Sequence, residues 1–195
     1  MVDKKTTKTL VMVVLVCAII LAGYAYVRDR SAKKTQSEKL TKADELILYD
    51  LKNEYPHGAR DVVNLYSRML TCIYTERPEK KQLTQLVAQM RKLYATELCN
   101  DPDNTEEAQV QALQKEIQNS GEEQNKITNY VVEESSQVEY ETINDRQVAQ
   151  VDATYTIRNG NEYPKSTQTY LLVMEGEQWK ILGWQNSSES SKEKE

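Results

Sequence analysis

An uncharged apolar run near the N-terminus is the feature that most limits how this chain can fold. The run extends from Leu10 to Val27, and its 18 residues would form a helix about 27 Å long. That length is at the short end of what crosses the hydrocarbon core of a bilayer. Tyr24 and Tyr26 lie at its C-terminal end, where an aromatic ring with a polar hydroxyl suits the membrane interface. The sequence therefore predicts one transmembrane helix, with residues 10–27 in contact with the lipid bilayer.

The same segment also has the features of a cleaved signal peptide. Basic residues precede it between Lys4 and Lys8, and Gly23-Tyr24-Ala25 places small residues at the two positions that signal peptidase reads. Cleavage after Ala25 would release a secreted protein. Lipoprotein processing at Cys17 is disfavoured because bulky Val16 stands before it. We favour an uncleaved signal-anchor and keep secretion as the alternative.

The flanks of the run bear on its orientation. Three Lys residues precede it and four Lys or Arg residues follow it, so the distribution of positive charge does not decide which end faces the cytoplasm. An N-terminal signal-anchor usually leaves a short cytoplasmic stub, here residues 1–9, and exports the rest. Residues 28–40 are polar and are expected to form a juxtamembrane linker. The expected location is the cell membrane, single-pass, with an extracytoplasmic C-terminal domain.

Charge separates the head of the chain from the rest. The chain has 25 Lys and Arg residues and 30 Asp and Glu residues. Residues 1–34 contain seven of the basic and two of the acidic residues, so residues 35–195 contain 18 basic and 28 acidic residues. An acidic domain repels phosphate backbones, so nucleic-acid binding is disfavoured. One histidine, three cysteines and six glycines offer little material for a zinc site, a phosphate-binding loop or a thiol relay. No metal, cofactor or catalytic residue is expected.

The part of the chain after the linker begins with helical periodicity. Thr41-Lys-Ala-Asp44 resembles a capping box that would begin a short helix. About three longer helices follow. The first is expected over residues 58–73, with Gly58 as N-cap, the second over 78–98 and the third over about 104–121.

From Ile127 the apolar period changes to two, which indicates strands. One or two strands are expected up to Tyr140, and alternation over residues 149–157 predicts a strand with one buried face. Asn159-Gly160 indicates a tight hairpin turn. Strands over 167–174 and 178–184 follow, joined at Glu175-Gly176, and residues 186–195 read as a disordered tail. The expected fold class is α+β: about three helices on a curved antiparallel sheet of about four strands, over residues 41–185.

Several short sequences carry a resemblance to a known family. Tyr55-Pro56, Arg60–Arg68, Gln89–Tyr94 and the closing Trp179-Lys-Ile-Leu-Gly-Trp184 look like an uncharacterised family of bacterial single-pass membrane proteins. The exported domain of that family is similar to the nuclear transport factor 2-like, or cystatin-like, α+β cone. The resemblance implies a membrane-tethered domain and brings no catalytic residues. Where family members often have Thr-Pro before the Arg of the first helix, this chain has Gly58-Ala59.

Tyrosines are the best candidates for a ligand pocket, because each offers an apolar ring and one hydroxyl. The alternative is that they replace phenylalanine, which the chain lacks, in the core. Buried hydroxyls need partners, so a cluster of them facing a cavity would suit a small hydrophobic ligand. The candidates are Tyr66, Tyr94, Tyr130, Tyr155 and Tyr170, with Tyr140 and Tyr163 as further members of the set.

Trp179 and Trp184 are candidates for contact with a partner protein. They are five residues apart on one expected strand, which would place them on opposite faces, one in the core and one partly exposed. The C-terminal tail could instead cover that strand edge.

The positions of the remaining reactive side chains, Cys72, Cys99, His57 and Asp152, indicate structural roles. Cys72 and Cys99 would lie about 30 Å apart at the two ends of the expected helix 78–98, so two free thiols are expected, with Cys72 buried. His57 reads as a surface or capping residue of a helix-entry loop. Asp152 alternates with the apolar face of its strand and should point away from the core.

These features favour a non-enzymatic, membrane-anchored binding module at the bacterial cell envelope, whose partner is an envelope protein or a small hydrophobic ligand. Two alternatives stay open. One is a scaffold subunit of an envelope assembly or secretion machine, which would arrive with stoichiometric partners. The other is a small-molecule enzyme, which would need an ionisable side chain inside the cone.

Overall fold

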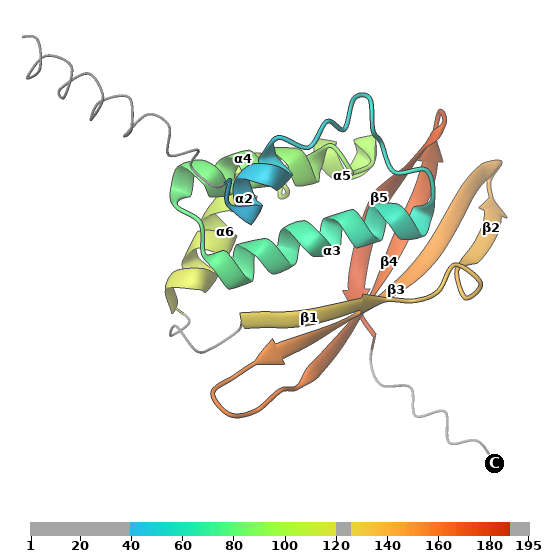
Figure 1. The fold of residues 1–195 in the computed structure, drawn as a ribbon. Coiled ribbons are helices and arrows are strands. Elements are labelled where there is room, and N and C mark those ends of the chain that lie inside the picture. Colours follow the sequence, from blue (N-terminus) through green and yellow to red (C-terminus); the bar gives the residue numbers. More distant parts are fainter. Residues whose placement is uncertain (1–39, 120–125, 188–195) are drawn as a thin grey trace, which may run out of the picture. The chain divides into compact units, whose positions relative to one another are not determined.

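A computed structural model describes residues 40–119 and 126–187. Five helices precede a five-stranded antiparallel sheet in this part of the chain, which confirms the α+β class (Figure 1). The helices are α2 (Lys42–Ile47), α3 (Ala59–Glu76), α4 (Lys80–Arg91), α5 (Thr96–Asn100) and α6 (Glu106–Asn119). The strands are β1 (Lys126–Val132), β2 (Glu139–Ile143), β3 (Arg146–Arg158), β4 (Lys165–Glu175) and β5 (Gln178–Asn186).

The predicted transmembrane segment, Leu10 to Val27, lies outside the described residues. Within residues 40–119 and 126–187, no helix has the length and apolar character needed to cross a bilayer.

Helix α3 packs more extensively against the sheet than any other described helix. Its N-cap is Gly58, and Asp61 lies in its first turn, as predicted. The expected apolar stripe is buried except for Leu70, which is partly buried, and α3 contacts β1, β3 and β5 (Figure 1). Helix α2 also begins as predicted, because Thr41 and Asp44 form a complete capping box. The stripe of α3 consists of Val62, Leu65, Tyr66, Met69, Leu70 and Ile73.

Strand β3 is the longest strand and organises the sheet. One side of β3 pairs with β1 through residues 153–158 and with β2 through residues 146–150, and its other side pairs with β4, which in turn pairs with β5. The extra strand arises because Asn144 and Asp145 both have positive φ, which forms a tight β2–β3 hairpin of the primed type. The sequence pattern of one or two strands up to Tyr140 did not resolve that turn.

The prediction of one helix over residues 78–98 is wrong, because helix α4 ends at Arg91. The backbone N–H of Ala95 donates to the Ile181 carbonyl and the N–H of Ile181 donates to the Leu93 carbonyl, each over 2.8 Å. This pairing covers part of the β5 edge with the segment 93–95, and a short helix, α5, follows. Hydrogen bonds to the sheet thus override the helical periodicity of this segment.

The prediction that Trp179 and Trp184 face opposite sides of the sheet is also wrong. Trp179 pairs with Met174 and Trp184 pairs with Tyr170, and since paired residues share a face, both tryptophans lie on the same face. The cause is a β-bulge at Leu182, which adds one residue to β5 and shifts its alternation. Trp179 is 7% exposed and Trp184 is 39% exposed.

Two boundaries near the C-terminus also differ from expectation. The β3–β4 turn is centred on Gly160 and Asn161, since Asn159 and Glu162 exchange both backbone hydrogen bonds, and only Gly160 has positive φ. Asn186 still belongs to β5, so the predicted tail begins too early. The thiols of Cys72 and Cys99 are free and Cys72 is buried, although the straight helix that separated them in the prediction is broken.

We expect Gly176→Ala to lower the free energy of unfolding by about 1 kcal/mol, because Gly176 has a φ of +61° in the β4–β5 turn. Gly183→Ala is the matched control. Gly183 has no positive φ and open space at its Cβ, so we expect a change within about 0.5 kcal/mol. Urea denaturation of the full-length chain measures both values, and equal effects would contradict the role assigned to Gly176.

Candidate functional site

The outer face of α3 carries two depressions that meet at one residue. Asp61, Asn64, Leu65 and Arg68 line the first, which has a volume of about 470 Å³. Arg68 also lines the second, of about 540 Å³, which continues along the same helix as far as Glu76. The spacings of three and four residues place both sets on one side of the helix. We call the first cavity the loop depression and the second the β1 depression.

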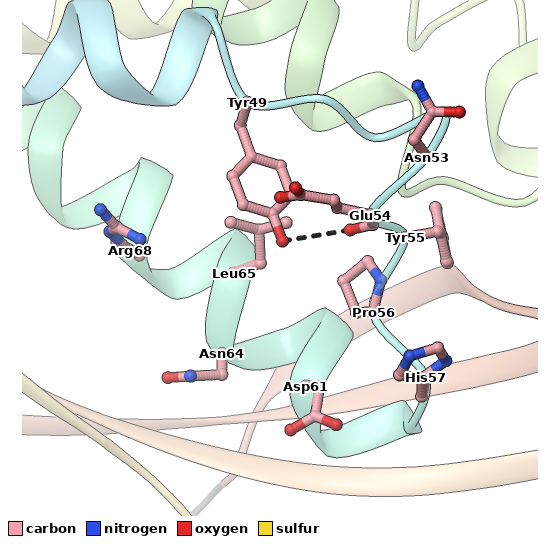
Figure 2. Close-up of a pocket in the computed structure, with 10 residues that line it drawn as sticks. All are labelled: Tyr49, Asn53, Glu54, Tyr55, Pro56, His57, Asp61, Asn64, Leu65 and Arg68. Carbon is pink, nitrogen blue, oxygen red and sulfur yellow. Dashed lines mark hydrogen bonds between the residues drawn. The ribbon is translucent and has the colours of Figure 1, made fainter.

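The wall of the loop depression is the connection between α2 and α3, residues 48–58, which is held by its own hydrogen bonds. The Asp50 carboxylate accepts from the backbone N–H groups of Lys52 and Asn53 and from the Asn53 amide, and these Asn53 contacts lower the pKa of Asp50. The Tyr49 hydroxyl donates to the Glu54 carbonyl over 3.1 Å (Figure 2). The loop therefore has a defined shape before any ligand binds.

Tyr55 connects this loop to the sheet. Its hydroxyl donates to the carbonyl of Trp179 over 2.8 Å, and the Lys180 ammonium lies 4.3 Å from the centre of its ring. Burial lowers the pKa of Lys180 and raises that of Tyr55. The cation–π contact and the hydrogen bond fix the C-terminal end of the loop beside α3.

Some of the polar side chains that line the loop depression have no partner among the described residues. Among the described residues, the side chains of Glu54, His57 and Asn64 form no hydrogen bond or ion pair. Asp61 has only a 3.9 Å ion pair with Arg60. Figure 2 shows Asn64 and Asp61 on α3 facing the open space, with His57 on the loop that leads into the helix. These groups are free to bind a ligand.

The β1 depression lies between α2, α3 and β1. Its border with the loop depression is marked by an ion pair of 3.8 Å between Arg68 and Glu45. Both side chains are 53% exposed, so the pair contributes at most about 1 kcal/mol and can open for a ligand. The hydroxyl of Thr71 is buried here without a partner. Burial raises the pKa of Cys72, also in this wall, to about 11, which keeps its thiol protonated at neutral pH.

Four of the five predicted pocket tyrosines, Tyr66, Tyr94, Tyr155 and Tyr170, are buried in the core. Tyr66, Tyr94 and Tyr170 surround Trp184, with ring centres between 5.5 and 6.3 Å apart wherever two of the four rings contact. Their burial and mutual contact match the alternative in which tyrosine replaces phenylalanine. Whether any of them also contacts a ligand stays a prediction.

The hydroxyls of the core tyrosines form a hydrogen-bonded chain. Ser67 bonds to Tyr155, Tyr155 to Tyr170, and Tyr170 donates to Gln168, each over 2.7 Å. Burial raises the pKa of Tyr155 and of Tyr170. The chain satisfies hydroxyls that would otherwise be costly to bury.

Two of the five predicted tyrosines line cavities. Tyr155 and Gln168 border a small cavity of about 190 Å³ between α3, α6 and the sheet. Tyr130 lines the β1 depression. Of the further tyrosines named from the sequence, Tyr140 has its ring centre 5.5 Å from that of Trp179 in a tilted arrangement, and Tyr163 is exposed.

Sequence reasoning missed the residues that line the loop depression. The sequence did contain a pattern that could have identified Asp61, Asn64 and Arg68, because they repeat at helical spacing opposite the apolar stripe. No such pattern was available for Tyr49, whose position depends on the fold of the loop. His57 is exposed as expected, and Asp152 points away from the core, where it accepts a hydrogen bond from Thr169. No metal-binding group of three or more ligands occurs among the described residues.

Comparison with known proteins gives one finding. The family described as Domain of unknown function (DUF6715) matches residues 1–184. No curated protein and no solved structure matches the chain. The match agrees with the expected uncharacterised family, whereas the single-pass topology and the nuclear transport factor 2-like fold stay predictions.

We expect the free energy of unfolding to fall as the pH rises above 10. The buried tyrosines have raised pKa values in the native state, whereas in the unfolded state tyrosine titrates near pH 10. The unfolded state then binds fewer protons, and stability decreases by about 1.4 kcal/mol per pH unit for each such tyrosine. Tyr170→Phe should reduce this slope, and should cost about 1–2 kcal/mol at pH 7 because two hydrogen bonds are lost.

The matched control is Tyr163→Phe, which removes an exposed hydroxyl. Urea denaturation between pH 7 and pH 11 measures the slope for both variants and for the unmodified chain. Identical slopes for the two variants would contradict the assignment of Tyr170 to a native-state tyrosine network.

Proposed function

Because this chain belongs to the family described as Domain of unknown function (DUF6715), whose description names no activity, we propose its function from its own residues. The proposal is a membrane-anchored, extracytoplasmic binding module, without enzymatic activity, at the bacterial cell envelope. Its binding site is the outer face of α3, which comprises the loop depression and the β1 depression.

The observation that carries the binding role is the set of unpartnered polar side chains in a pre-shaped cavity. Glu54, His57 and Asn64 line the loop depression without partners among the described residues, while the loop that holds two of them is fixed by Asp50 and Tyr49. A site whose shape exists before binding loses little conformational entropy when a ligand arrives. The cavity volume also lies within the usual range of ligand sites, about 300–1,000 Å³.

Anchoring is supported by the sequence alone. Leu10 to Val27 is long enough and apolar enough to span a bilayer, and residues 28–40 provide a polar connection to the domain. The acidic composition of the domain disfavours direct contact with anionic lipid. The α+β architecture, with α3 packed on a sheet whose central strand β3 is 13 residues long, is compatible with the proposed cone of the nuclear transport factor 2-like type.

A scaffold role is the second candidate, and strand β2 is the observation that favours it. Among the described strands β2 pairs only with β3, which leaves its other edge open. Tyr140 and Ile143 on this strand are 55% and 50% exposed. An open strand edge with apolar side chains can pair with another chain. A scaffold would use this edge, whereas a binding module would use the outer face of α3.

The enzyme alternative required an ionisable side chain within the apolar interior. The buried side chains among the described residues include tyrosines and Cys72, but no carboxylate, histidine, lysine or arginine. The support for a binding role over a cavity enzyme is this composition together with the surface position of the loop depression.

We expect the full-length chain to fractionate with membranes, and external protease added to spheroplasts to digest the domain. The reason is that residues 10–27 would hold the chain in the bilayer and lead to export of the domain C-terminal to them. Intact mass and immunoblotting measure the outcome. Loss of the first 25 residues with release into the medium would support the secreted alternative, and protection of a full-length domain would place it in the cytosol.

We expect a photo-crosslinking amino acid at Asn64 to give an adduct with an envelope component in living cells. Asn64 is exposed and faces the loop depression. Gln118 is the matched control, because it is an exposed amide on α6 that lines neither depression. A third variant at Tyr140 tests the scaffold role. Equal adducts at Asn64 and Gln118 would contradict a site on α3, and adducts at Tyr140 alone would favour the scaffold.

A further inference from the structure

The loop depression offers hydrogen-bond donors and acceptors together. The Asn64 amide supplies both, the His57 ring supplies a donor, and the Glu54 and Asp61 carboxylates supply acceptors. These groups come from both walls of the cavity, the loop and the helix (Figure 2). A ligand that satisfies them must itself carry several groups that donate and accept, and hydroxyls do both.

An apolar wall lies beside these polar groups. The ring of Tyr49, the Leu65 side chain and Pro56 all line the depression (Figure 2). Because the Tyr49 hydroxyl is bonded to the Glu54 carbonyl, the ring is held in place by its polar end. A fixed aromatic ring beside planar amide and carboxylate groups suits a molecule with one apolar C–H face and hydroxyls at its rim.

The charge of the depression selects against anions. Three carboxylates, Glu45, Glu54 and Asp61, lie at this site against two cations, because Arg68 is paired with Glu45 and Arg60 lies 3.9 Å from Asp61. Phosphate, sulfate and carboxylate ligands would therefore meet net negative charge. A neutral ligand meets no such repulsion.

We propose that the loop depression binds a neutral oligosaccharide, with a sugar ring against Tyr49 and its hydroxyls bonded to Asn64, Glu54 and Asp61. This inference rests on the proposed function, since it names the ligand of that site. A sugar residue has the combination that the lining requires: an apolar face, several hydroxyls and no charge. The loop depression shares Arg68 with the β1 depression, so a longer sugar chain can continue along α3 if the exposed ion pair of Arg68 with Glu45 opens.

A peptide fits the same site less well. An extended peptide is usually bound by the free edge of a strand, and a helical one by an apolar groove. The loop depression has neither, because its polar groups are side chains and the backbone N–H groups of Asn53 and Glu54 are bonded to Asp50. Side-chain amides and carboxylates are the groups that pair with hydroxyls.

The test is a titration of the full-length chain in a detergent without a sugar headgroup, since sugar detergents would compete. The neutral probes are tetramers of β-1,4-linked N-acetylglucosamine, cellotetraose and maltotetraose. The charged probes are tetragalacturonic acid and spermine, and an uncharged tetrapeptide of Gly and Ser represents peptides. Saturation-transfer NMR and calorimetry detect binding. We expect at least one neutral tetramer to bind with a Kd below about 1 mM, and about tenfold more tightly than every other class.

Variants locate the binding. Asn64→Leu removes the amide, and Tyr49→Leu removes the ring, so each should weaken binding about tenfold, or about 1.4 kcal/mol. Tyr49→Phe keeps the ring but loses its hydrogen bond to the Glu54 carbonyl, so it should bind more weakly than the unmodified chain and more tightly than Tyr49→Leu. Gln118→Leu, on α6 outside both depressions, should have no effect.

Three results would overturn the inference: no neutral tetramer binds below about 1 mM, spermine, tetragalacturonic acid or the peptide binds more tightly, or Asn64→Leu binds as well as Gln118→Leu. The crosslinking experiment at Asn64 distinguishes this failure from failure of the proposed function. If Asn64 gives an adduct but no saccharide binds, the site on α3 stands and the saccharide is rejected as its ligand. If Asn64 gives no adduct and no saccharide binds, the site itself is rejected.

Discussion

Backbone pairing at Ile181 is the interaction on which the arrangement of the domain depends. Ile181 exchanges two 2.8 Å hydrogen bonds with Leu93 and Ala95, which stops the second long helix and covers part of the β5 edge. The neighbouring residue, Leu182, is the bulge that turns Trp184 toward the core. Tyr94 lies between the two paired residues, and its ring therefore meets Trp184 at 5.9 Å. One short stretch of β5 thus determines a helix end, a sheet edge and the aromatic core.

Helix α3 gives this core its second surface and carries the candidate site on its opposite side. Its apolar stripe packs on β1, β3 and β5, and the polar positions between stripe residues face the two depressions. Because the stripe anchors the helix through many buried contacts, changes at Asn64 or Arg68 leave the packing of Val62 and Met69 intact. The exposed positions of the site, such as Asn64 and Arg68, therefore contribute little to the packing of the fold.

Most of the local structure could be predicted from the sequence, because local rules determine it. The capping box at Thr41, the stripe of α3 and the alternation of β3 each depend on residues close together in the chain. The errors involve contacts that periodicity does not encode. The break after Arg91 requires β5 as a partner, the bulge at Leu182 requires β4 opposite, and the position of Tyr49 requires the Asp50 turn. The tyrosine core was foreseen as the alternative to a pocket.

The attachment of α2 determines how the domain responds to tension. A pull on the chain before Thr41 enters the domain at α2, and α2 is fastened to α4: Gln89 donates to the carbonyls of Ile47 and Tyr49, and Gln82 donates to the Asp44 carboxylate over 3.0 Å. These bonds bear the load before residues 50–57 do. The hydrogen bonds between α2 and α4 therefore keep a pulling force from reaching the loop. The loop, which forms half of the candidate site, keeps its shape until α2 detaches.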